Sequence, residues 1–475
     1  MLKHLLFCLA GSVSLSHAGP DYPPGTVAWD SLPRHLQGRR PGTWTEADVA
    51  AHSRFVRSVA AKADENPTPK LIPPVAALKR LIESQPRIYM HFVQMFEQIP
   101  WRRPYWLDSA GHDPEIRDYE HMLRVLNHVA TTGPSLESSG IPMTNVMSYA
   151  MGTSSGYAAF LDPDVNDAIA RILAYWRRFL ESPDSRNVLT SSGDSGWLGP
   201  TTLDALERLG NAPYNTSLKF CELYQCDSSD EYYGFNSWDD FFARRLRPGS
   251  RPVASPDDDN VIVSACEASP YNVVRDVKLR DTFWAKGQPY SIRDMLGHDP
   301  LAEEFAGGTI YQAFLTPLTY HRWNAPVSGV VRRAMIVPGN YFSIPLSFGV
   351  GDRNQTDIRS DAVVQSQAYF TSIATRAVIV IEADNPAIGL MAFIAVGMTD
   401  VSSCEIGVRE GQHLRKGQEI GTFHYGGSTH CLLFRPGLEL DDLPQAGNVT
   451  LTHVNNVPVG GRLAVVRGSA QKRRV

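Results

Sequence analysis

The chain has 475 residues, of which 43% are hydrophobic and 20% are charged, and its formal net charge is -5. This length and apolar content suffice for two or three domains with buried cores. Charges of both signs are spread along the chain without a long basic or acidic block, so the composition gives no support for nucleic acid as a partner.

The N-terminal segment 1–18 has the pattern of a secretory signal peptide. It combines a basic start, an apolar run over residues 5–15 and small residues suited to signal-peptidase cleavage. We therefore expect a protein of the secretory pathway or the extracellular space, or a cytoplasmic protein if the segment is not such a signal. No later apolar run approaches the roughly 20 residues that span a bilayer, so we expect at most peripheral membrane contact. Removal of Cys8 with the signal would leave an odd number of cysteines, which does not suggest a disulfide framework.

The first half of the chain has helical periodicity. Apolar residues recur at helical spacing in the segments 75–99, 115–133, 162–182, 201–210 and 237–246. Pro86 is expected to break the first of these helices. Gly133 is the expected C-cap of the second helix, and Asp162 begins the third. These segments predict a packed helical region.

The pattern changes at about Asn260, where short runs of Val, Ile, Phe and Tyr alternate with Gly, Pro and Asp. Strands are expected within the segments 260–268, 308–323, 329–337, 377–384, 389–398 and 417–427. The sequence therefore predicts an α+β protein with a helical N-terminal region followed by a β-rich region.

Several polar residues follow these predicted elements. The stretch "WDDFFARRLRPGSRPV" gathers Arg244, Arg245, Arg247 and Arg251, which form either an anion clamp or a solvated basic face. Glu267 follows an apolar strand, where its carboxylate either orients a catalytic histidine or lies at an edge in water. His321 lies beside Arg322 in a turn region, a position that suits an acid-base group.

The stretch "GTFHYGGSTHCLLF" interrupts a β pattern with two glycines, a serine and a threonine. A hairpin turn is one explanation. The other is that the peptide bond between Gly427 and Ser428 breaks, because a serine hydroxyl can attack the carbonyl before it and glycine leaves that carbonyl accessible. The resulting ester can eliminate to dehydroalanine, whose hydrolysis leaves a pyruvoyl group at a new N-terminus.

Together these stretches resemble the phosphatidylserine decarboxylase family. "FFARRLRPGSRP" is similar to a Phe-Phe-x-Arg-x-Leu-x-x-Gly-x-Arg-Pro element of that family, "YHRWNAPVSG" to its Tyr-His-Arg element, and "GGST" to its Gly-Ser-Thr cleavage motif. The stretches "YYGFNSWDDFFARR", "IEADNPAIG", "GMTDVSSCEIGVREGQH" and "FHYGGS" are closer to a fungal branch that includes the pyruvoyl-type L-tryptophan decarboxylases. The resemblance covers nearly all of the chain after about Pro67.

The resemblance implies a domain organisation and a chemistry. It implies a helical domain over 40–190, like that of the L-tryptophan decarboxylases, and a pyruvoyl catalytic domain over 230–470. Cleavage before Ser428 would give a β chain and an α chain of residues 428–475, whose pyruvoyl cofactor forms a Schiff base with the substrate amine. The implied substrate is an aromatic amino acid such as tryptophan, or phosphatidylserine, and the resemblance assigns His321 to the decarboxylation step.

Two positions depart from the parent family, whose self-cleavage is similar to a serine-protease triad. Glu267 occupies the position of the family's aspartate, and Asn324 occupies the position of its histidine. Because asparagine cannot act as a base, another group must accept the serine proton if cleavage occurs.

A histidine close to Ser428 is the expected replacement base. If the segment from Phe423 to Cys431 is extended throughout, His424 and His430 project to the same side as Ser428. His430 is the preferred base, with Glu267 as the group that orients it. The alternatives are that Glu267 itself is the base, its pKa raised by burial, or that the chain stays uncleaved and serves as a binding or assembly protein.

Overall fold

The structure is a computed structural model that describes residues 46–99, 115–135, 141–191, 196–281, 290–345, 366–400, 403–425, 428–441, 443–446 and 456–467. The expected signal segment 1–18 and the expected cleavage residue Gly427 lie outside these ranges. None of the helices in the described ranges combines the length and the apolar character needed to cross a membrane.

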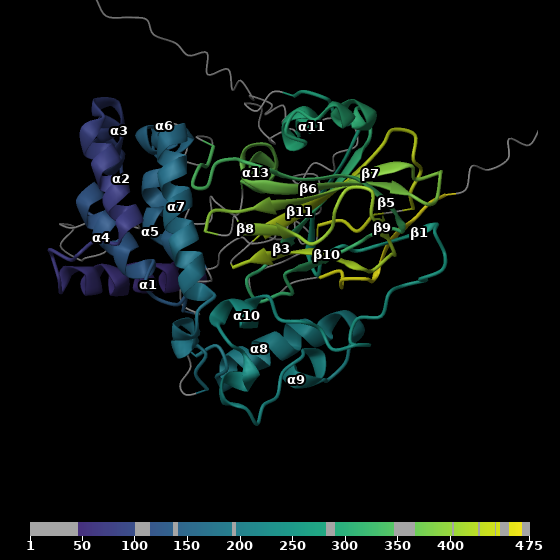
Figure 1. The fold of residues 1–475 in the computed structure, drawn as a ribbon, viewed down its shortest axis with the longest axis horizontal. Coiled ribbons are helices and arrows are strands. Elements are labelled where there is room, and N and C mark those ends of the chain that lie inside the picture. The colour runs from purple at the N-terminus through teal and green to yellow at the C-terminus, as the bar shows by residue number, and fades with distance from the viewer. Residues whose placement is uncertain are drawn as a thin grey trace, which may run out of the picture.

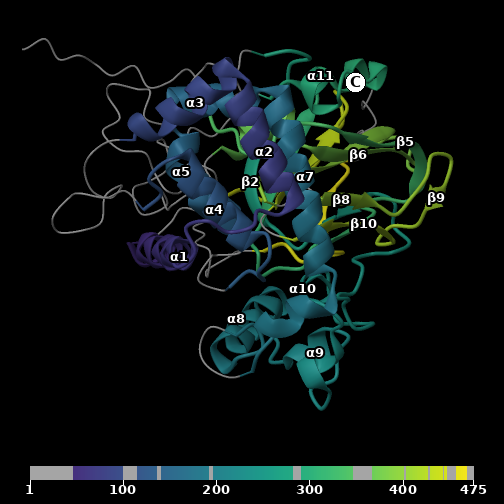
Figure 2. The same ribbon diagram turned by 60° about the vertical axis from the view of Figure 1, so that its left-hand side comes forward.

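A bundle of helices forms the N-terminal region and lies to one side of the sheets (Figures 1 and 2). Its helices are α1 (Glu46–Asp64), α2 (Pro73–Ser84), α3 (Pro86–Glu97), α4 (Tyr119–Val129), α5 (Pro142–Met151), α6 (Ser154–Leu161) and α7 (Pro163–Leu180). The predicted break at Pro86 is confirmed, because Gln85 is extended and separates α2 from α3. The predicted start at Asp162 is also confirmed, since its carboxylate accepts hydrogen bonds from the backbone N–H groups of Asp164 and Val165.

The predicted helix over 115–133 is too long at both ends. Asp118 is extended, and its side chain accepts a hydrogen bond from the backbone N–H of His121, so the helix starts after it. The helix ends at Val129 with Ala130 as its C-cap, and Gly133 has no capping role. The capping residues therefore set the ends of this helix, whereas the prediction had used apolar periodicity alone.

A second group of short helices packs below the sheets (Figure 1). It consists of the 3-10 helix η3 (Pro183–Val188), α8 (Pro200–Asn211), the 3-10 helix η4 (Ala212–Tyr214), α9 (Phe220–Leu223), the 3-10 helix η5 (Glu231–Gly234) and α10 (Trp238–Phe242). The predicted helix over 237–246 therefore ends at Phe242. A disulfide joins Cys221 to Cys226, whereas Cys266, Cys404 and Cys431 are free thiols.

The β-rich region contains a seven-stranded, a three-stranded and a two-stranded sheet, all with antiparallel pairing. In sheet order, the seven strands are β2 (Ser269–Arg275), β3 (Thr309–Leu315), β11 (Ser428–Phe434), β7 (Leu390–Gly397), β6 (Arg376–Ala383), β5 (Gly329–Val337) and β9 (His413–Leu414). The smaller sheets are β4 (Arg322–Asn324), β10 (Glu419–His424) and β8 (Ser403–Ile406), and β1 (Val261–Val263) with β12 (Arg462–Val465). Short helices α11 (Ile292–Met295), η6 (Pro300–Phe305) and α13 (Gln367–Ile373) accompany them.

The arrangement confirms the predicted α+β class. The segment 308–323, expected as one strand, is divided between β3 and β4, which belong to different sheets. Strand β2 was not predicted, because Pro270 and Asn272 give its sequence the composition of a turn.

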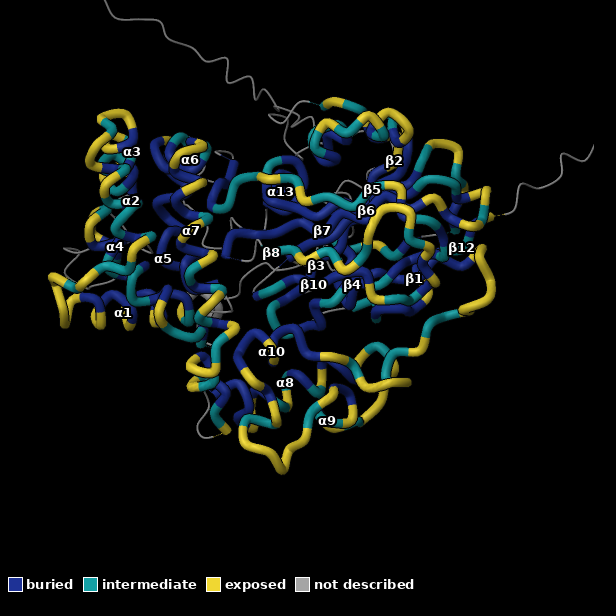
Figure 3. The backbone as a smooth tube through the Cα atoms, in the orientation of Figure 1, coloured by how far each residue is buried: buried dark blue, intermediate teal, exposed yellow. Residues whose placement is uncertain are grey.

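The central strands of the large sheet are buried on both faces (Figure 3). One face packs with the helices, through residues such as Ile310 and Cys431. The other face packs against the smaller sheets, through residues such as Leu432 and Phe393. Strand β11 is buried along its whole length, as expected for a strand covered on both faces.

Candidate active site

Ser428 is the first residue of β11 and lies between two neighbouring strands. It pairs with Leu315 of β3 and with Gly397 of β7. Its side chain is fully buried, and its Oγ has no hydrogen-bond partner within the described part of the chain. The hydroxyl is thus held at one end of the sheet without a hydrogen-bonded base.

His430 lies on the same face of β11 as Ser428, two residues further along the strand. Its strand neighbours are the small residues Ala313 and Ala395, and its ring packs 5.9 Å from the ring of Phe393. Neither ring nitrogen has a hydrogen-bond partner among the described residues. Burial lowers the pKa of His430 to about 3, so the imidazole is neutral at physiological pH.

Glu267 does not orient His430, which corrects that expectation. Both of its carboxylate oxygens accept hydrogen bonds from Arg251, at 2.5 Å from Nε and 2.8 Å from Nη2. The two side chains are 2% and 3% exposed. Burial alone would lower the pKa of Arg251, but the bonds to Glu267 outweigh it and raise that pKa. Glu267 therefore belongs to a buried ion pair.

Asn324, which the resemblance puts at the position of the family's histidine, bonds to the turn between β9 and β10. Its Nδ2 donates a hydrogen bond of 2.7 Å to the carbonyl of Gly417, and its backbone N–H donates to the carbonyl of Ala265. Its Oδ1 is buried and has no partner in the ranges described. The amide thus ties β4 to neighbouring loops and makes no hydrogen bond with Ser428.

His321 lies directly before β4, in the connection from β3. Its Nδ1 is 3.0 Å from the carbonyl oxygen of Thr319, and its ring centroid is 4.1 Å from that of Phe242. The side chain is fully buried. A carbonyl acceptor at Nδ1 places the proton of the neutral ring there, so that Nε2 is the basic nitrogen.

The predicted arginine cluster does not form an anion clamp. Arg244 is buried, donates to the carbonyls of Leu318 and Thr319, and lies 4.4 Å from the ring of Tyr224. Arg251 is committed to Glu267, and only Arg245 and Arg247 are exposed. Arg244 thereby supports the loop that leads to His321. The four arginines therefore form neither an anion clamp nor a wholly solvated basic face.

Arg322 is likewise engaged within the protein. Its Nε donates to the carbonyl of Ala243 at 2.7 Å, and its Nη1 pairs with Glu419 at 2.7 Å. These contacts join β4 to β10 and to the end of α10.

The extended alternation expected from Phe423 to Cys431 is wrong. Strand β10 ends at His424 in the three-stranded sheet, whereas β11 starts at Ser428 in the seven-stranded sheet. Between them Tyr425 has a φ of 29°, in the left-handed region that a bulky side chain rarely adopts. His424 and His430 therefore do not share one strand face.

Tyr425 is enclosed by three aromatic rings, which we call the aromatic cage: Trp176 of α7, Trp238 of α10 and Phe242 of α10. Their centroids lie 4.7 Å, 4.5 Å and 5.7 Å from that of Tyr425. Tyr425 is 4% exposed as a result. Sequence reasoning missed this cage because its residues come from distant segments; the available signal was the aromatic content of "YWRRF" and "WDDFF".

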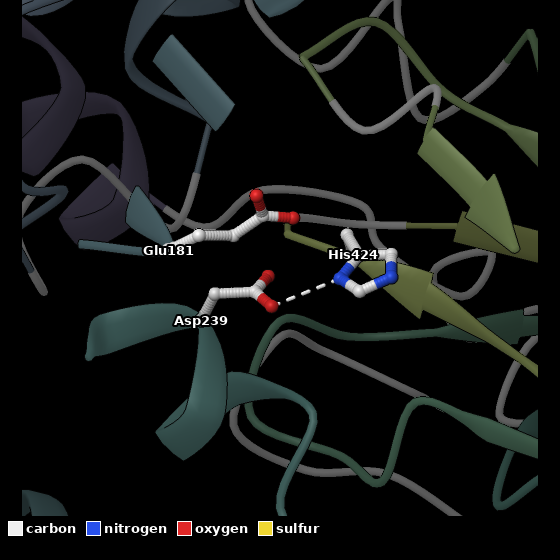
Figure 4. A group of neighbouring side chains, drawn as sticks. All are labelled: Glu181, Asp239 and His424. Atoms are coloured by element: carbon white, nitrogen blue, oxygen red, sulfur yellow. Dashed lines mark hydrogen bonds and ion pairs between the residues drawn. The ribbon is translucent and has the colours of Figure 1, made fainter. Parts of the chain in front are cut away.

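The residues next to the cage form a charged network around His424 (Figure 4). Asp239 lies 2.9 Å from Nδ1 of His424, and Glu405 lies 2.8 Å from Nε2. Arg177 bonds Glu181 at 2.6 Å and approaches Glu405 at 3.5 Å. Burial by itself would lower the pKa of His424, but the bonds to Asp239 and Glu405 prevail and raise it.

Glu181, Asp239 and His424 offer donor atoms that lie within 4.8 Å of one another, close enough to share a cation. However, both ring nitrogens of His424 face carboxylates. This arrangement favours the imidazolium form, which has no lone pair for a metal ion. We therefore assign the group as a hydrogen-bonded ion network.

Comparison with known proteins places this site in a family. Two family profiles, both described as phosphatidylserine decarboxylase, match residues 72–206 and 238–464. The chain is 42% identical to "Decarboxylase iboD" of Amanita muscaria over 302 residues, which are 62% of this chain and 84% of that protein. It is 36% identical to "L-tryptophan decarboxylase" of Psilocybe cubensis over 403 residues, which are 82% of this chain and 88% of that protein.

More distant relatives carry the name of the whole family. The "Phosphatidylserine decarboxylase proenzyme" of Chlamydia trachomatis is 29% identical over 229 residues, or 47% of this chain and 67% of that protein. The profile matches and the long alignments to decarboxylases agree with the motifs around His321 and Ser428. The chain belongs to the phosphatidylserine decarboxylase family and is a carboxy-lyase that acts on a small-molecule substrate.

Proposed function

We propose that this protein is a pyruvoyl-dependent decarboxylase that removes the α-carboxylate of an amino-acid substrate after self-cleavage between Gly427 and Ser428. The observation that carries the proposal is the state of Ser428: a buried hydroxyl without a hydrogen-bond partner in the described chain, at the start of a central strand. A buried polar group without a partner is costly, so its retention at this position points to a chemical role.

The residues around Ser428 fit a pyruvoyl group at this position. Strand β11 is paired on both sides, so a new N-terminus at Ser428 would stay fixed by its neighbours Leu315 and Gly397. Gly397 has no side chain to obstruct a group there. A pyruvoyl carbonyl supplies an acceptor for the substrate amine and for the electron pair released with CO₂.

His321 is the residue that we propose for proton transfer during decarboxylation. The Thr319 carbonyl fixes its tautomer, and Phe242 packs on its ring, so the imidazole has one defined orientation. Arg244 strengthens this placement because it binds the carbonyls of Leu318 and Thr319. Fixing a general acid or base in this way lowers the entropic cost of proton transfer.

For the cleavage step, His430 stays our proposed base, because it shares the face of Ser428 and is neutral. Its low pKa makes it a weak base, so this step should be slow. Glu267 is a poorer candidate, since Arg251 occupies both of its carboxylate oxygens.

One observation favours a second function. Asn324 replaces the family's histidine, and Ser428 Oγ has no base within hydrogen-bonding distance in the part of the chain described. A chain that never cleaves would serve as a binding or assembly protein with the same fold.

The secretory destination expected from segment 1–18 is likewise a proposal.

Denaturing electrophoresis with mass spectrometry separates these functions. Cleavage would release a fragment of residues 428–475, about a tenth of the 52.5 kDa chain, whose mass reports the pyruvoyl end. Release of CO₂ from tryptophan, tyrosine, phenylalanine and phosphatidylserine, assayed side by side, then gives the substrate. A single full-length chain without decarboxylase activity would favour the binding function.

A further inference from the structure

The aromatic cage contacts His321, and the residue that it encloses is close to Ser428 in the sequence. Phe242 contacts both Tyr425 and His321, with centroid distances of 5.7 Å and 4.1 Å. Tyr425 itself precedes Ser428 by three residues, which span at most ~11 Å of extended chain. The ring of Tyr425 thus occupies an aromatic site within reach of both Ser428 and His321.

Tyr425 lies in the cage with a strained backbone. Its φ of 29° lies in the left-handed region, which a bulky non-glycine residue rarely adopts because it strains the backbone. If the chain is cut before Ser428, Tyr425 becomes the third residue from a free C-terminus. The covalent connection to β11 that helps to keep Tyr425 in this conformation is then lost, and its departure from the cage would relieve the strain.

The cage also contains an unused hydrogen-bond donor. Trp238 is 1% exposed, and its Nε1 has no partner among the described residues. In contrast, Nε1 of Trp176 donates to the carbonyl of Thr132 at 2.9 Å. A buried indole N–H normally has an acceptor, so Trp238 is suited to a ligand that brings one.

The charged network fixes the two helices that build the cage and the strand that leads to Tyr425. Arg177 follows Trp176, Asp239 follows Trp238, and His424 precedes Tyr425 in the sequence. The bond between Asp239 and His424 links α10 to β10, and Arg177 connects α7 to Glu405 of β8. The cage walls therefore keep their spacing independently of the ring that they enclose.

We propose that the cage of Trp176, Trp238 and Phe242 binds the aromatic side chain of the substrate, and that Tyr425 fills this site until cleavage frees it. This inference rests on the proposed self-cleavage. The proposal implies that the substrate is an amino acid with an uncharged aromatic or heteroaromatic ring. Edge-to-face contacts like those of Tyr425 would hold such a ring. A phosphodiester headgroup would find the neighbouring cations Arg177 and His424 already paired with carboxylates.

Binding of indole, measured by isothermal titration calorimetry, tests the occupancy of the cage without relying on activity. The processed wild-type protein should bind indole at least tenfold more tightly than Ser428→Ala, in which Tyr425 stays in place. The double variant Ser428→Ala/Tyr425→Ala should regain binding, because removal of the Tyr425 ring leaves the three cage rings free to make edge-to-face contacts with indole. Tyr425→Leu in the same background repeats the test if the alanine variant does not fold.

Ser428→Ala/Phe160→Ala is the matched control, since Phe160 is a buried ring in the helical region that packs on Phe92 and Phe342. Equal indole binding by this control, or by Ser428→Ala alone, would overturn the proposal. So would the absence of binding in both Tyr425 variants when they are folded. If the wild-type chain is never cleaved, the proposed function fails, whereas the Tyr425 variants still decide whether the cage accepts an aromatic ring.

A kinetic test addresses the substrate class in the processed enzyme. Trp238→Ala should raise KM for an aromatic amino acid at least tenfold, and Trp238→Phe should restore the part of the loss that comes from ring packing. Unchanged KM in Trp238→Ala would contradict the assignment of the cage as the side-chain site.

Discussion

The ion pair between Arg251 and Glu267 gives the sharpest prediction about stability. Replacing Arg251 with alanine removes two hydrogen bonds, of 2.5 Å and 2.8 Å, from a carboxylate whose side chain is 2% exposed. It also removes the bond from Arg251 to the carbonyl of Gly210 at 2.7 Å. Removing one partner of a buried ion pair costs about 3–5 kcal/mol, because the other charge stays buried without compensation. We expect a loss of this size for Arg251→Ala.

The assay is urea unfolding of Arg251→Ala, Glu267→Leu and the double variant Arg251→Met/Glu267→Leu, followed by circular dichroism. The double variant should be more stable than either single variant, since it leaves no buried charge. Arg208→Ala is a control, because the Arg208 and Asp204 side chains are 58% and 75% exposed, and exposed pairs contribute little. A loss below about 1 kcal/mol in Arg251→Ala would refute the structural assignment and return Glu267 to the candidates for the cleavage base.

Three further predictions concern the histidines. His321→Ala should leave cleavage largely intact and lower turnover by about 100-fold to 10,000-fold, measured as the rate of CO₂ release; unchanged turnover would remove His321 from the mechanism. His430→Ala should slow the appearance of the small fragment and Asn324→His should accelerate it, both followed by electrophoresis, whereas full-speed cleavage in His430→Ala would exclude His430 as the base. The raised pKa of His424 means that its pairing with Asp239 stabilises the protein fully below the unfolded pKa of about 6.5, and that this stabilisation is lost as the pH rises through the folded value. The melting temperature of Asp239→Asn should therefore approach that of the wild type at alkaline pH, and a pH-independent difference would contradict this role.

Local signals in the sequence were sufficient for much of the helical region. Pro86 and Asp162 act on their own backbone neighbours, so their effects on α2, α3 and α7 could be predicted without tertiary structure. The strands were harder, because a strand is stabilised by partners that are distant in sequence. Segment 308–323 was therefore expected as one strand, although β3 and β4 pair in different sheets.

The candidate site likewise combines residues that local motifs identify with contacts between distant segments. Ser428, His321 and Asn324 could be located from motifs, because the motifs are short and continuous. The sequence did not predict that Arg251 binds Glu267 or that Trp176 packs on Tyr425. These contacts join segments that only the fold brings together. The alternation expected across Phe423 to Cys431 failed because Tyr425 adopts a positive φ, which no pattern of apolar residues reports.

The most direct test of the proposed function is the intact mass of the purified wild-type protein under denaturing conditions. We predict a fragment of residues 428–475 that begins with a pyruvoyl group in place of Ser428, together with the β chain that ends at Gly427. Treatment with a carbonyl-reactive hydrazine should add one equivalent to the small fragment and none to the Ser428→Ala protein. A single chain that is uncleaved at Gly427 and does not react with the hydrazine would contradict the assignment of this protein as a pyruvoyl-dependent decarboxylase.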